Sequence, residues 1–418
     1  MAAIDILADA AEKADQDPYS LPLDKINVAN PFLFARDIHG AWFKRLRDEA
    51  PVHYCAESFF GPYWSITRYE EIIKVDTSHD IFSSEPAITI GDTQESFHLP
   101  MFIAMDRPKH DEQRKVVSPV TGAENLRHFE PIIRARTIDV LDNLPVGETF
   151  DWVDSVSIEL TTRMLATLFD FPFDERRKLT RWSDVATAIP GMHIIDTEEQ
   201  RQQELLGCLE YFTGLWNERV NRAPGNDLVS MLAHGEATRN MPPLEYLGNL
   251  VLLIVGGNDT TRSTMTASAL ALHQHPDQFK KLVANPQLID SMVAETIRWQ
   301  TPLAHMRRMC KVDTQLGGQH IKAGDKVVMW YVSGNRDERF MQNPDAFIID
   351  RPDVRRHLSF GFGIHRCMGN RLAELQLRIL WEEILQRFAR IEVMGEPQRT
   401  VSTFVHGFTA LPVQLHPL

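Results

Sequence analysis

Residues 360–369 read FGFGIHRCMG and place one cysteine, Cys367, in a glycine-rich turn. Glycine accepts positive φ and lets the backbone approach closely, so this turn can lie flat against a planar partner and present the sulfur. The following residues, NRLAEL at 370–375, begin a strong helical pattern. Cys367 therefore stands beside a helix N-terminus, where the helix dipole favours a thiolate over a thiol. A thiolate presented to a large ring indicates a haem axial ligand.

Other roles of Cys367 predict other patterns. A lone cysteine is most often a small, buried apolar residue. A zinc site, or haem attached covalently through Cys-x-x-Cys-His, needs a pair of closely spaced ligands, and the sequence contains no Cys-x-x-Cys. The complete ten-residue pattern, found where two further motifs predict it, favours ligation of haem iron.

The sequence resembles the cytochrome P-450 family, the haem-thiolate monooxygenases, over nearly its whole length. The family's ligand loop matches Phe360 to Gly369. The resemblance therefore implies haem b, with Cys367 as the proximal iron ligand and with Phe360 and Gly361 beside the cofactor. Thiolate ligation favours O–O cleavage. The implied chemistry is O₂ activation with electrons that come ultimately from NAD(P)H through redox partners.

A second motif, GGNDTT at residues 256–261, lies on a long apolar helix predicted after Leu244. Two glycines inside a helix cost about 1 kcal/mol each relative to alanine, and they would let the helix backbone approach the iron. The resemblance implies that Gly256 borders the cofactor and that Asp259 and Thr260 relay protons to the distal oxygen. The alternative is a simple helix cap after a Gly-Gly break.

Glu295 and Arg298 match the family's E-x-x-R and lie on one helix face at i, i+3. Such pairs are common on solvated helices, but this one lies between the other two motifs, as the family requires. The implied role is structural: a buried ion pair that braces the ligand loop, with Arg351 as a third member. Removing one partner from such a pair costs about 3–5 kcal/mol.

Haem propionates require cationic partners. His110 and Arg114 match the family's H-x-x-x-R pair, Arg307 matches the basic residue beyond E-x-x-R, and His365 precedes the ligand by two residues. The resemblance implies that these four residues bind the propionates, although each alone could be a plain surface charge.

The chain has 44 basic and 57 acidic residues, a net charge of −13. Such an acidic chain offers no electrostatic footprint for nucleic acid. A local basic patch on it suggests docking of an acidic electron donor such as a ferredoxin, which would receive its electrons from a ferredoxin reductase. The alternative is that these basic residues are scattered, solvated charges. The candidate patch residues are Arg107, Lys109, Lys115, Arg355, Arg356 and Arg366.

The predicted fold class is mainly α with small β-sheets, in one domain over 1–418. We expect a β-rich N-terminal lobe within about 40–105, and a helical core with the ligand loop over 106–418. The runs 52–54 and 63–67 flank Gly-Pro and predict a hairpin, and a second hairpin is expected around 404–408.

Four widely spaced cysteines predict no disulfide framework and a cytoplasmic protein. The first residues show no signal-peptide pattern, and no apolar stretch approaches the roughly 20 residues that span a bilayer. We therefore expect a monomer without a membrane anchor, similar to the soluble bacterial members of the family. The cysteines are Cys55, Cys208, Cys310 and Cys367.

The segments expected around the substrate are mostly apolar, which predicts a small apolar substrate. The strings at 100–106, 303–308 and 405–408 resemble the soluble bacterial alkane terminal-hydroxylase subfamily, whose members oxidise medium-chain alkanes and fatty acids at the ω carbon. The candidate pocket residues are Ile88, Phe97, Leu99, Met101, Ile189, Met192, Leu252, Leu303, Ala304, Phe404 and Val405.

Other functions remain open. The same chemistry on a terpene, aromatic or steroid substrate is the first alternative. A non-catalytic haem sensor or electron carrier is a remote one, because a sensor would normally carry an output module and a carrier would not need Asp259 and Thr260.

Overall fold

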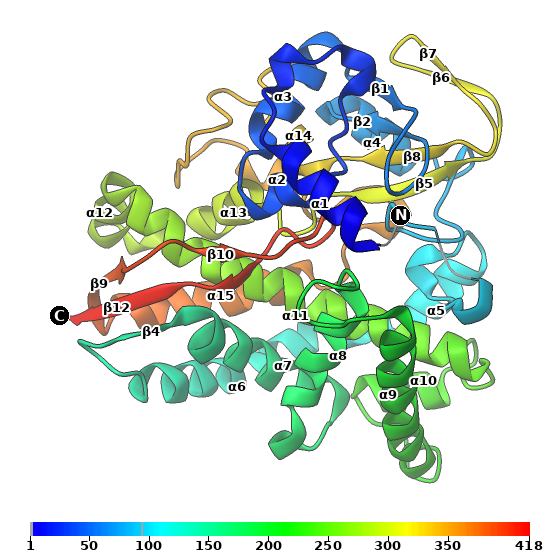
Figure 1. Cartoon of the computed structure of the whole chain (residues 1–418). Coiled ribbons are helices and arrows are strands. Elements are labelled where there is room, and N and C mark those ends of the chain that lie inside the picture. The colour runs from blue at the N-terminus through cyan, green and yellow to red at the C-terminus, as the bar shows by residue number, and fades with distance from the viewer. Residues whose placement is uncertain (1–2, 93–94) are drawn as a thin grey trace.

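The structure is a computed structural model that describes residues 3–92 and 95–418. Helices form most of it, with small separate sheets, which confirms the predicted fold class (Figure 1). The helices are α1 (Ala3–Ala14), α2 (Pro31–Ala35), α3 (His39–Glu49), α4 (Tyr69–Thr77), α5 (Lys109–Val117), α6 (Ala123–Asp142), α7 (Glu159–Phe169), α8 (Arg177–Thr187), α9 (Glu198–Arg219), α10 (Leu228–His234), α11 (Pro243–Gln274), α12 (Pro276–Ala284), α13 (Ile289–Gln300), α14 (Tyr331–Gly334) and α15 (Asn370–Leu385).

Short turns connect these helices. A π-helical turn, Val153–Ile158, leads directly into α7. The 3₁₀ turns are Pro18–Ser20, Leu23–Lys25, Glu95–Phe97, Phe102–Ala104, Ser118–Thr121, Phe173–Glu175, Pro286–Leu288, Val354–Arg356 and Gly363–His365.

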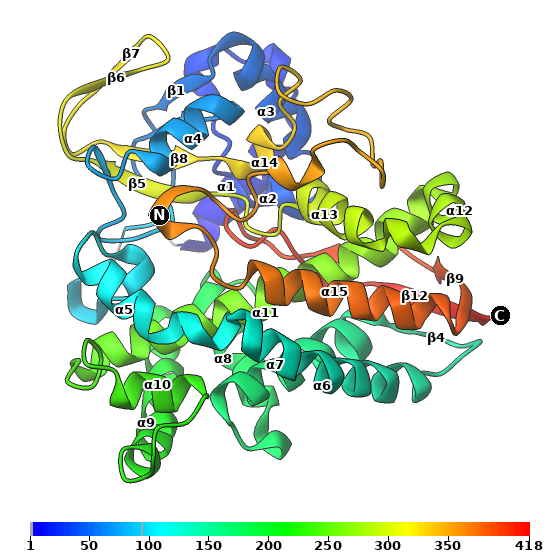
Figure 2. The same ribbon diagram turned by 180° about the vertical axis from the view of Figure 1, so that it is seen from behind.

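Helix α11 is the centre of the helical part. It begins with Pro243 at its first position, where the missing N–H costs nothing, and its sequence is apolar around most of its surface. Helices α7, α8 and α9 pack on one side of α11, and α13 and α15 contact it on the other. From behind, α15 and the loop that precedes it lie in front of α11 (Figure 2).

A five-stranded sheet has the order β1-β2-β8-β5-β3. The predicted hairpin is confirmed: β1 (Val52–Cys55) pairs antiparallel with β2 (Tyr63–Ile66). β2 then pairs in parallel with β8 (Lys326–Met329), which pairs with β5 (Met306–Cys310), and β3 (Phe82–Ser83) pairs with β5. Three strands of this sheet, β1, β2 and β3, come from the segment 40–105 in which the sequence predicts a β-rich lobe, and the other two come from 306–329.

The other strands lie mainly toward the C-terminus. β12 (Pro412–Pro417) pairs with both β4 (Thr149–Asp151) and β9 (Phe388–Val393). β10 (Gln398–Arg399) pairs with β11 (Phe408–Ala410), and an isolated bridge joins Leu303 to Val405. The expected closing hairpin is thus the β10–β11 ribbon, whose turn contacts the segment after α13. A separate hairpin joins β6 (Thr314–Leu316) to β7 (Gln319–Ile321).

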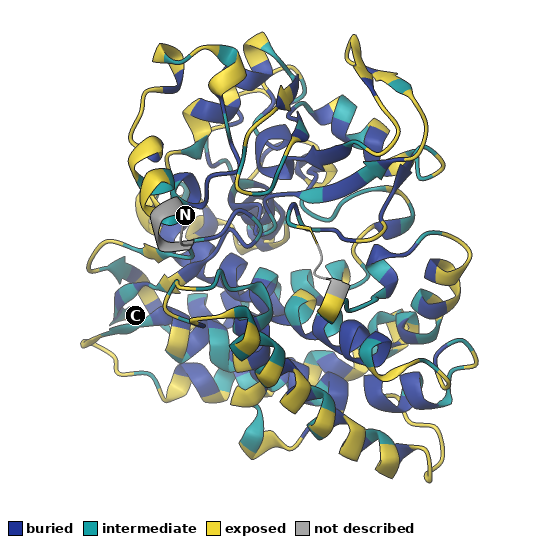
Figure 3. Cartoon of the chain, turned by 45° about the vertical axis from the view of Figure 1, so that its right-hand side comes forward, coloured by how far each residue is buried: buried dark blue, intermediate teal, exposed yellow. Residues whose placement is uncertain are grey.

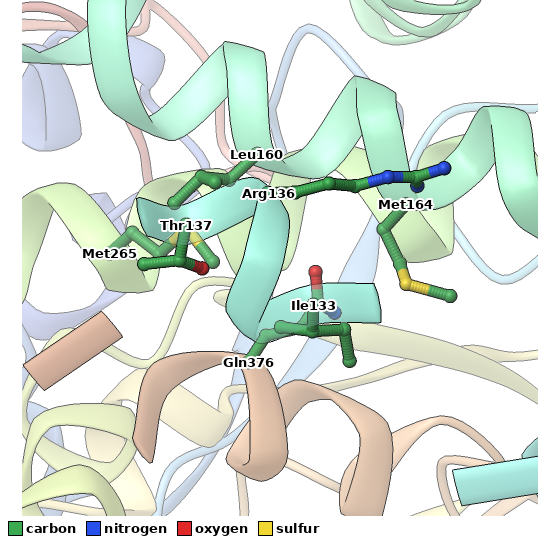
Figure 4. Close-up of a pocket in the computed structure, with 7 residues that line it drawn as sticks. All are labelled: Ile133, Arg136, Thr137, Leu160, Met164, Met265 and Gln376. Carbon is green, nitrogen blue, oxygen red and sulfur yellow. The ribbon is translucent and has the colours of Figure 1, made fainter. Parts of the chain in front are cut away.

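Buried residues line the inner faces of the helices and the sheet, and exposed residues mark the outer helices (Figure 3). Among the residues that the structure describes, no helix combines the length and hydropathy needed to cross a membrane. A small cavity between α6, α7, α11 and α15 measures ≈ 10 Å³, about enough for one water (Figure 4). None of the predicted site residues lines it.

Candidate active site

The loop that carries Cys367 is held by backbone hydrogen bonds. The Cys367 N–H donates to the Phe360 carbonyl over 2.8 Å, and the Gly361 N–H donates to Leu358 over 2.7 Å. Gly361 and Gly363 have φ of 64° and 69°, which glycine adopts freely. A Cβ on Gly363 would stand 2.7 Å from the Asp76 carbonyl oxygen. These two glycines therefore seat the loop on the end of α4.

Asp76 is a site residue that the sequence reasoning missed. Its side chain is buried, and its Oδ2 accepts from the Phe362 N–H over 2.8 Å and from the Tyr331 hydroxyl over 2.9 Å. Its Oδ1 accepts from Arg308 Nη2 over 2.7 Å. A buried acid with no motif around it gives no sequence signal, although it fixes the start of the ligand loop.

The side chain of Cys367 is exposed to open space. Protein atoms nevertheless surround this space closely enough for burial to affect the thiol. Burial raises the pKa of its thiol, while the Gly369 and Asn370 N–H groups, Arg114 and Arg366 act in the opposite direction. The helix start thus supplies the donors that the sequence predicted. Burial nevertheless outweighs them, so the pKa of the Cys367 thiol lies above its ordinary value.

Glu295, Arg298 and Arg351 form one buried network. Arg298 donates to both Glu295 carboxylate oxygens at 2.7 and 2.8 Å, and Arg351 Nε lies 3.2 Å from each. The spare guanidinium N–H groups bind carbonyls of residues 335–346. The network therefore holds the meander that precedes the ligand loop.

Asn335 links this network to the ligand loop. Its carbonyl accepts from Arg298, its Oδ1 accepts from the Leu358 N–H over 2.7 Å, and its Nδ2 donates to Ser359 Oγ over 2.9 Å. Ser359 Oγ donates in turn to the Ile297 carbonyl of α13. The expected bracing of the loop therefore runs through an asparagine that sequence reasoning did not single out.

Three predicted propionate ligands come together. The rings of His110 and His365 lie 4.2 Å apart between centroids, and Arg114 donates to the Arg366 carbonyl beside them. Burial and the nearby charges of Arg308, His110 and Arg114 lower the pKa of His365 to about 2. His110 Nε2 and both ring nitrogens of His365 are buried without a hydrogen-bond partner.

The structure does not bring Arg307 to this cluster. Its Nη1 lies 2.8 Å from Asp92 Oδ1 and donates to the Gly91 carbonyl. The next residue, Arg308, lies at the cluster instead, where its charge acts on His365. Successive side chains of a strand point to opposite faces, so one of these two adjacent arginines on β5 must face away.

The sequence predicts that both glycines of α11 let its backbone approach the iron, but the two glycines have different surroundings. A Cβ on Gly257 would stand 2.7 Å from Leu165 Cδ2, so this glycine makes room for α7. A Cβ on Gly256 would meet no atom within 4 Å. Thr260, one turn later, donates its hydroxyl to the Gly256 carbonyl over 3.0 Å. Gly256 and Thr260 thus border open space on one face of α11.

Asp259 faces the opposite side, toward α8. Its Oδ1 accepts from Ser183 over 3.0 Å and from Arg262 over 2.9 Å. The same Arg262 nitrogen lies 2.9 Å from Asp184 Oδ1. Burial raises the pKa of the Asp259 carboxyl, and Arg262 opposes this shift. The predicted acid and alcohol are adjacent in sequence but do not hydrogen-bond to each other.

The candidate pocket residues fall into three groups. Leu303 and Val405 pair as a bridge, and the Ala304 N–H donates to the Phe404 carbonyl over 2.9 Å. Ala304 itself is fully buried in the core beneath the sheet. Phe97, Leu99 and Leu252 pack against the helical core. The remaining candidates lie on two connections: Ile88 and Met101 on the segment between β3 and α5, and Ile189 and Met192 on the turn between α8 and α9.

Several basic candidates for a docking patch already have acidic partners. Arg107 pairs with Asp111, Lys109 with Glu245, and Arg355 with Glu374. Arg356 lies over the Phe340 ring. Lys115 and Arg366 are exposed, and the described part of the chain offers neither of them an ion pair.

The residues present fit a haem. One cluster contains two cations, Arg114 and Arg308, and two histidines, His110 and His365, whose buried ring nitrogens lack hydrogen-bond partners. Such a cluster suits the two propionate carboxylates of haem. Cys367 offers sulfur to open space, and Gly256 leaves the facing helix bare. These features together define a haem-dependent oxidoreductase of the thiolate class.

Comparisons with known proteins agree. The model of the cytochrome P450 family matches residues 217–415. Linalool 8-monooxygenase of Pseudomonas putida is 34% identical over 94% of this chain and 100% of its own length. The methyl-branched lipid omega-hydroxylase of Mycobacterium bovis is 28% identical, with coverages of 95% and 96%. The structure of CYP153D17 from Sphingomonas sp. PAMC 26605 is 50% identical, with a TM-score of 0.88 over 94% of this chain and 100% of that one.

The chain belongs to the cytochrome P450 family. It is a monooxygenase that uses haem b and receives electrons from NAD(P)H through redox partners, as this family implies. Bacterial proteins of this fold typically take a small apolar substrate and use a ferredoxin with its reductase.

Proposed function

We propose that this monooxygenase hydroxylates the terminal carbon of medium-chain n-alkanes or fatty acids. The observation that carries the proposal is that the Leu303–Val405 bridge and the Ala304–Phe404 hydrogen bond hold two apolar segments together, and we propose that Leu303 and Phe404 form an apolar wall of the pocket. The relation over nearly the full length to a methyl-branched lipid omega-hydroxylase supports it.

Terminal selectivity has to come from the pocket. A primary C–H bond is stronger than its secondary neighbours, so a chain that tumbles freely would be oxidised internally. Burying each methylene stabilises a bound chain by about 0.8 kcal/mol, and a narrow apolar channel lets its methyl end alone reach the reacting centre.

When bound, haem supplies the iron that activates O₂, and we propose Cys367 as its ligand. In this proposal the propionates are bound by Arg308, Arg114, His110 and His365. Arg308 takes the role of propionate ligand that the sequence assigned to Arg307. The Glu295–Arg298–Arg351 network and Asp76 keep the Cys367 loop in one position.

We propose that Asp259 and Thr260 move protons toward the open face of α11. Asp259 is buried beside Arg262, so it must release this guanidinium before it can turn toward Thr260. Asp184 lies 2.9 Å from the same Arg262 nitrogen and is partly exposed. Arg262 therefore keeps a counter-ion when Asp259 moves, which lowers the cost of the motion.

The substrate proposal is tested by titrating the purified holoprotein with octane, decane and dodecanoic acid. Binding is followed by the haem spin-state change, and the alcohols formed are identified. We expect terminal alcohols, and Phe404→Ala should raise the share of internal alcohols. Phe150→Ala, a partly buried phenylalanine on β4, is the matched control and should leave that share unchanged.

A terpenoid substrate is the second candidate, because linalool 8-monooxygenase is 34% identical to the chain. Linalool and a steroid therefore belong in the same titration. Good turnover of linalool beside no turnover of linear chains would overturn the alkane and fatty-acid proposal and favour this one.

We also propose that an acidic ferredoxin docks at Lys115 and Arg366. Charge reversal at either residue should slow reduction by the native ferredoxin and flatten its salt dependence, without a change in substrate affinity. Lys322→Glu is the control, because this exposed lysine lies on the loop after β7. Equal reduction rates in all variants would contradict the docking proposal.

A further inference from the structure

A cluster of possible metal ligands lies away from the candidate active site, where the start of α3 meets the turn of the C-terminal ribbon. It consists of Asp37, His39 and His406, whose ligand atoms all lie within 4.8 Å of one another. Asp37 Oδ1 is 3.9 Å from His39 Nδ1 and 3.9 Å from His406 Nε2. The blue N-terminal helices and the red C-terminal segment meet at the centre of Figure 1.

The hydrogen bonds of His406 define which of its nitrogens is free. Its Nδ1 lies 2.6 Å from the Gln300 carbonyl oxygen, which can only accept, so Nδ1 carries the proton. In the neutral ring, Nε2 therefore carries no proton and has a lone pair available for a ligand. This Nε2 is buried, has no hydrogen-bond partner, and belongs to a side chain that is 5% exposed. It points toward a carboxylate, which is also an acceptor.

His39 adds a second unpartnered nitrogen. Its Nδ1 is buried without a hydrogen bond, and its ring is fixed by stacking on Phe34 at 5.0 Å and by an edge contact with His406 at 5.0 Å. The two rings thus place two unpartnered ring nitrogens within 4.8 Å of each other and of the Asp37 carboxylate.

We propose that Asp37, His39 and His406 bind a divalent transition-metal ion such as Zn²⁺. Two imidazoles and one carboxylate suit zinc rather than Ca²⁺ or Mg²⁺, which prefer oxygen ligands. The observed separations of 3.9 Å exceed by about half an ångström the ligand spacing of a tetrahedral zinc site, so a small inward movement completes it.

The surroundings already resemble the outer shell of a metal site. A ligating histidine usually donates its other N–H to a carbonyl or carboxylate, as His406 does to Gln300. Arg399 binds the second oxygen of Asp37, with 2.7 Å between Nη2 and Oδ2, and leaves Oδ1 to the two histidines. Asp37 is exposed, which gives an ion a path from solvent.

A bound ion would join two distant parts of the chain. Asp37 lies between α2 and α3 and His39 is the first residue of α3, whereas His406 follows Phe404 and Val405 directly. Because the ion binds the folded protein, it should raise the melting temperature increasingly as the free ion concentration exceeds its dissociation constant. It would also restrain the segment that carries the proposed pocket wall, independently of the substrate.

The test uses the tag-free holoprotein and Zn²⁺ alone. Equilibrium dialysis with elemental analysis should give one zinc per haem in addition to the iron, and zinc should raise the melting temperature. His406→Asn and His39→Gln should each lower the zinc affinity at least tenfold. His320→Asn should not, because His320 lies on the surface outside this cluster, where its ring contacts Asp313 and Gln315.

X-ray absorption at the zinc edge of the wild-type protein gives a second measurement that does not depend on folding of the variants. Two imidazole nitrogens and at least one oxygen in the zinc shell support the proposal. No stoichiometric zinc, a shell without two imidazoles, or equal affinity in His406→Asn, His39→Gln and His320→Asn would overturn it.

Discussion

Asp76 and Arg308 form a buried ion pair, with 2.7 Å between Oδ1 and Nη2, although 232 residues separate them in the chain. Their side chains are 1% and 3% exposed. The other oxygen of Asp76 accepts from Phe362 of the ligand loop and from Tyr331. One carboxylate therefore joins the end of α4, strand β5 and the loop that carries Cys367.

Removing this carboxylate should strongly destabilise the protein. We expect Asp76→Ala to lower the free energy of unfolding by about 3–5 kcal/mol, because Arg308 keeps a buried charge without a partner. Urea unfolding of the holoprotein measures the change. Asp350→Ala, which breaks an exposed pair with Lys281, should cost at most about 1 kcal/mol. Equal losses in both variants would contradict the bracing role of Asp76.

The two adjacent arginines of β5 should differ in their effect on haem. Arg308→Ala should speed haem transfer to apomyoglobin by about 10- to 100-fold, the equivalent of one lost charged hydrogen bond. Arg307→Ala removes a contact with Asp92 and should change the transfer rate by no more than about threefold. A larger effect for Arg307 than for Arg308 would restore the sequence assignment.

Cys367 should be the iron ligand. Replacing it with histidine removes the thiolate, so the reduced protein with carbon monoxide should lose the red-shifted absorption band typical of thiolate ligation. Cys310→Ser is the control, because this buried cysteine donates to the Val312 carbonyl and lies on β5. Survival of the band in Cys367→His would refute the assignment.

Thr260→Ala should keep haem and substrate binding but divert electrons to hydrogen peroxide, since proton delivery loses its hydroxyl. The measurement is product formed per NAD(P)H consumed. Asp259→Asn should slow turnover more than it changes this ratio, because its carboxylate lies behind Thr260 toward α8. Thr264→Ala, one turn further along α11, is the control and should keep the wild-type ratio.

Stability should fall in acid because of His305. Its Nε2 accepts from the Ile90 N–H and its Nδ1 donates to the Thr403 carbonyl, so the ring is held neutral. Burial lowers the pKa of His305 to about 4, below the ordinary 6.5. Below pH 6.5 the unfolded state gains a proton that the folded state cannot accept. The contribution of His305 to the free energy of unfolding is therefore fully present above pH 6.5 and is lost as the pH falls toward 4.

The size of this effect follows from the shift. A pKa difference of roughly 2.5 units corresponds to about 3 kcal/mol. Urea unfolding at pH 7 and pH 4.5 should show that His305→Phe loses less stability on acidification than the wild type, whatever its starting stability. His320→Phe, an exposed histidine, should show the wild-type pH dependence. Identical pH dependence in all three proteins would refute the role of His305.

The sequence by itself determined the features that depend on neighbouring residues. The cysteine turn at 360–369, the helix that follows it, the glycine-rich stretch of α11, the Glu295–Arg298 pair and the β1–β2 hairpin are all local patterns, because their geometry is set by spacings of a few residues. These patterns were sufficient for the family, the fold class and the cofactor.

The tertiary structure decided what distant segments do to one another. Arg308 rather than Arg307 faces His365, because pairing with β3 and β8 sets which side of β5 points inward. Asp76 and Asn335 brace the ligand loop, Asp259 accepts from Ser183 of α8, and Arg262 pairs with Asp184, through contacts between residues tens to hundreds of positions apart. Local spacing carries no information about such pairs, since they depend on how whole helices and strands pack.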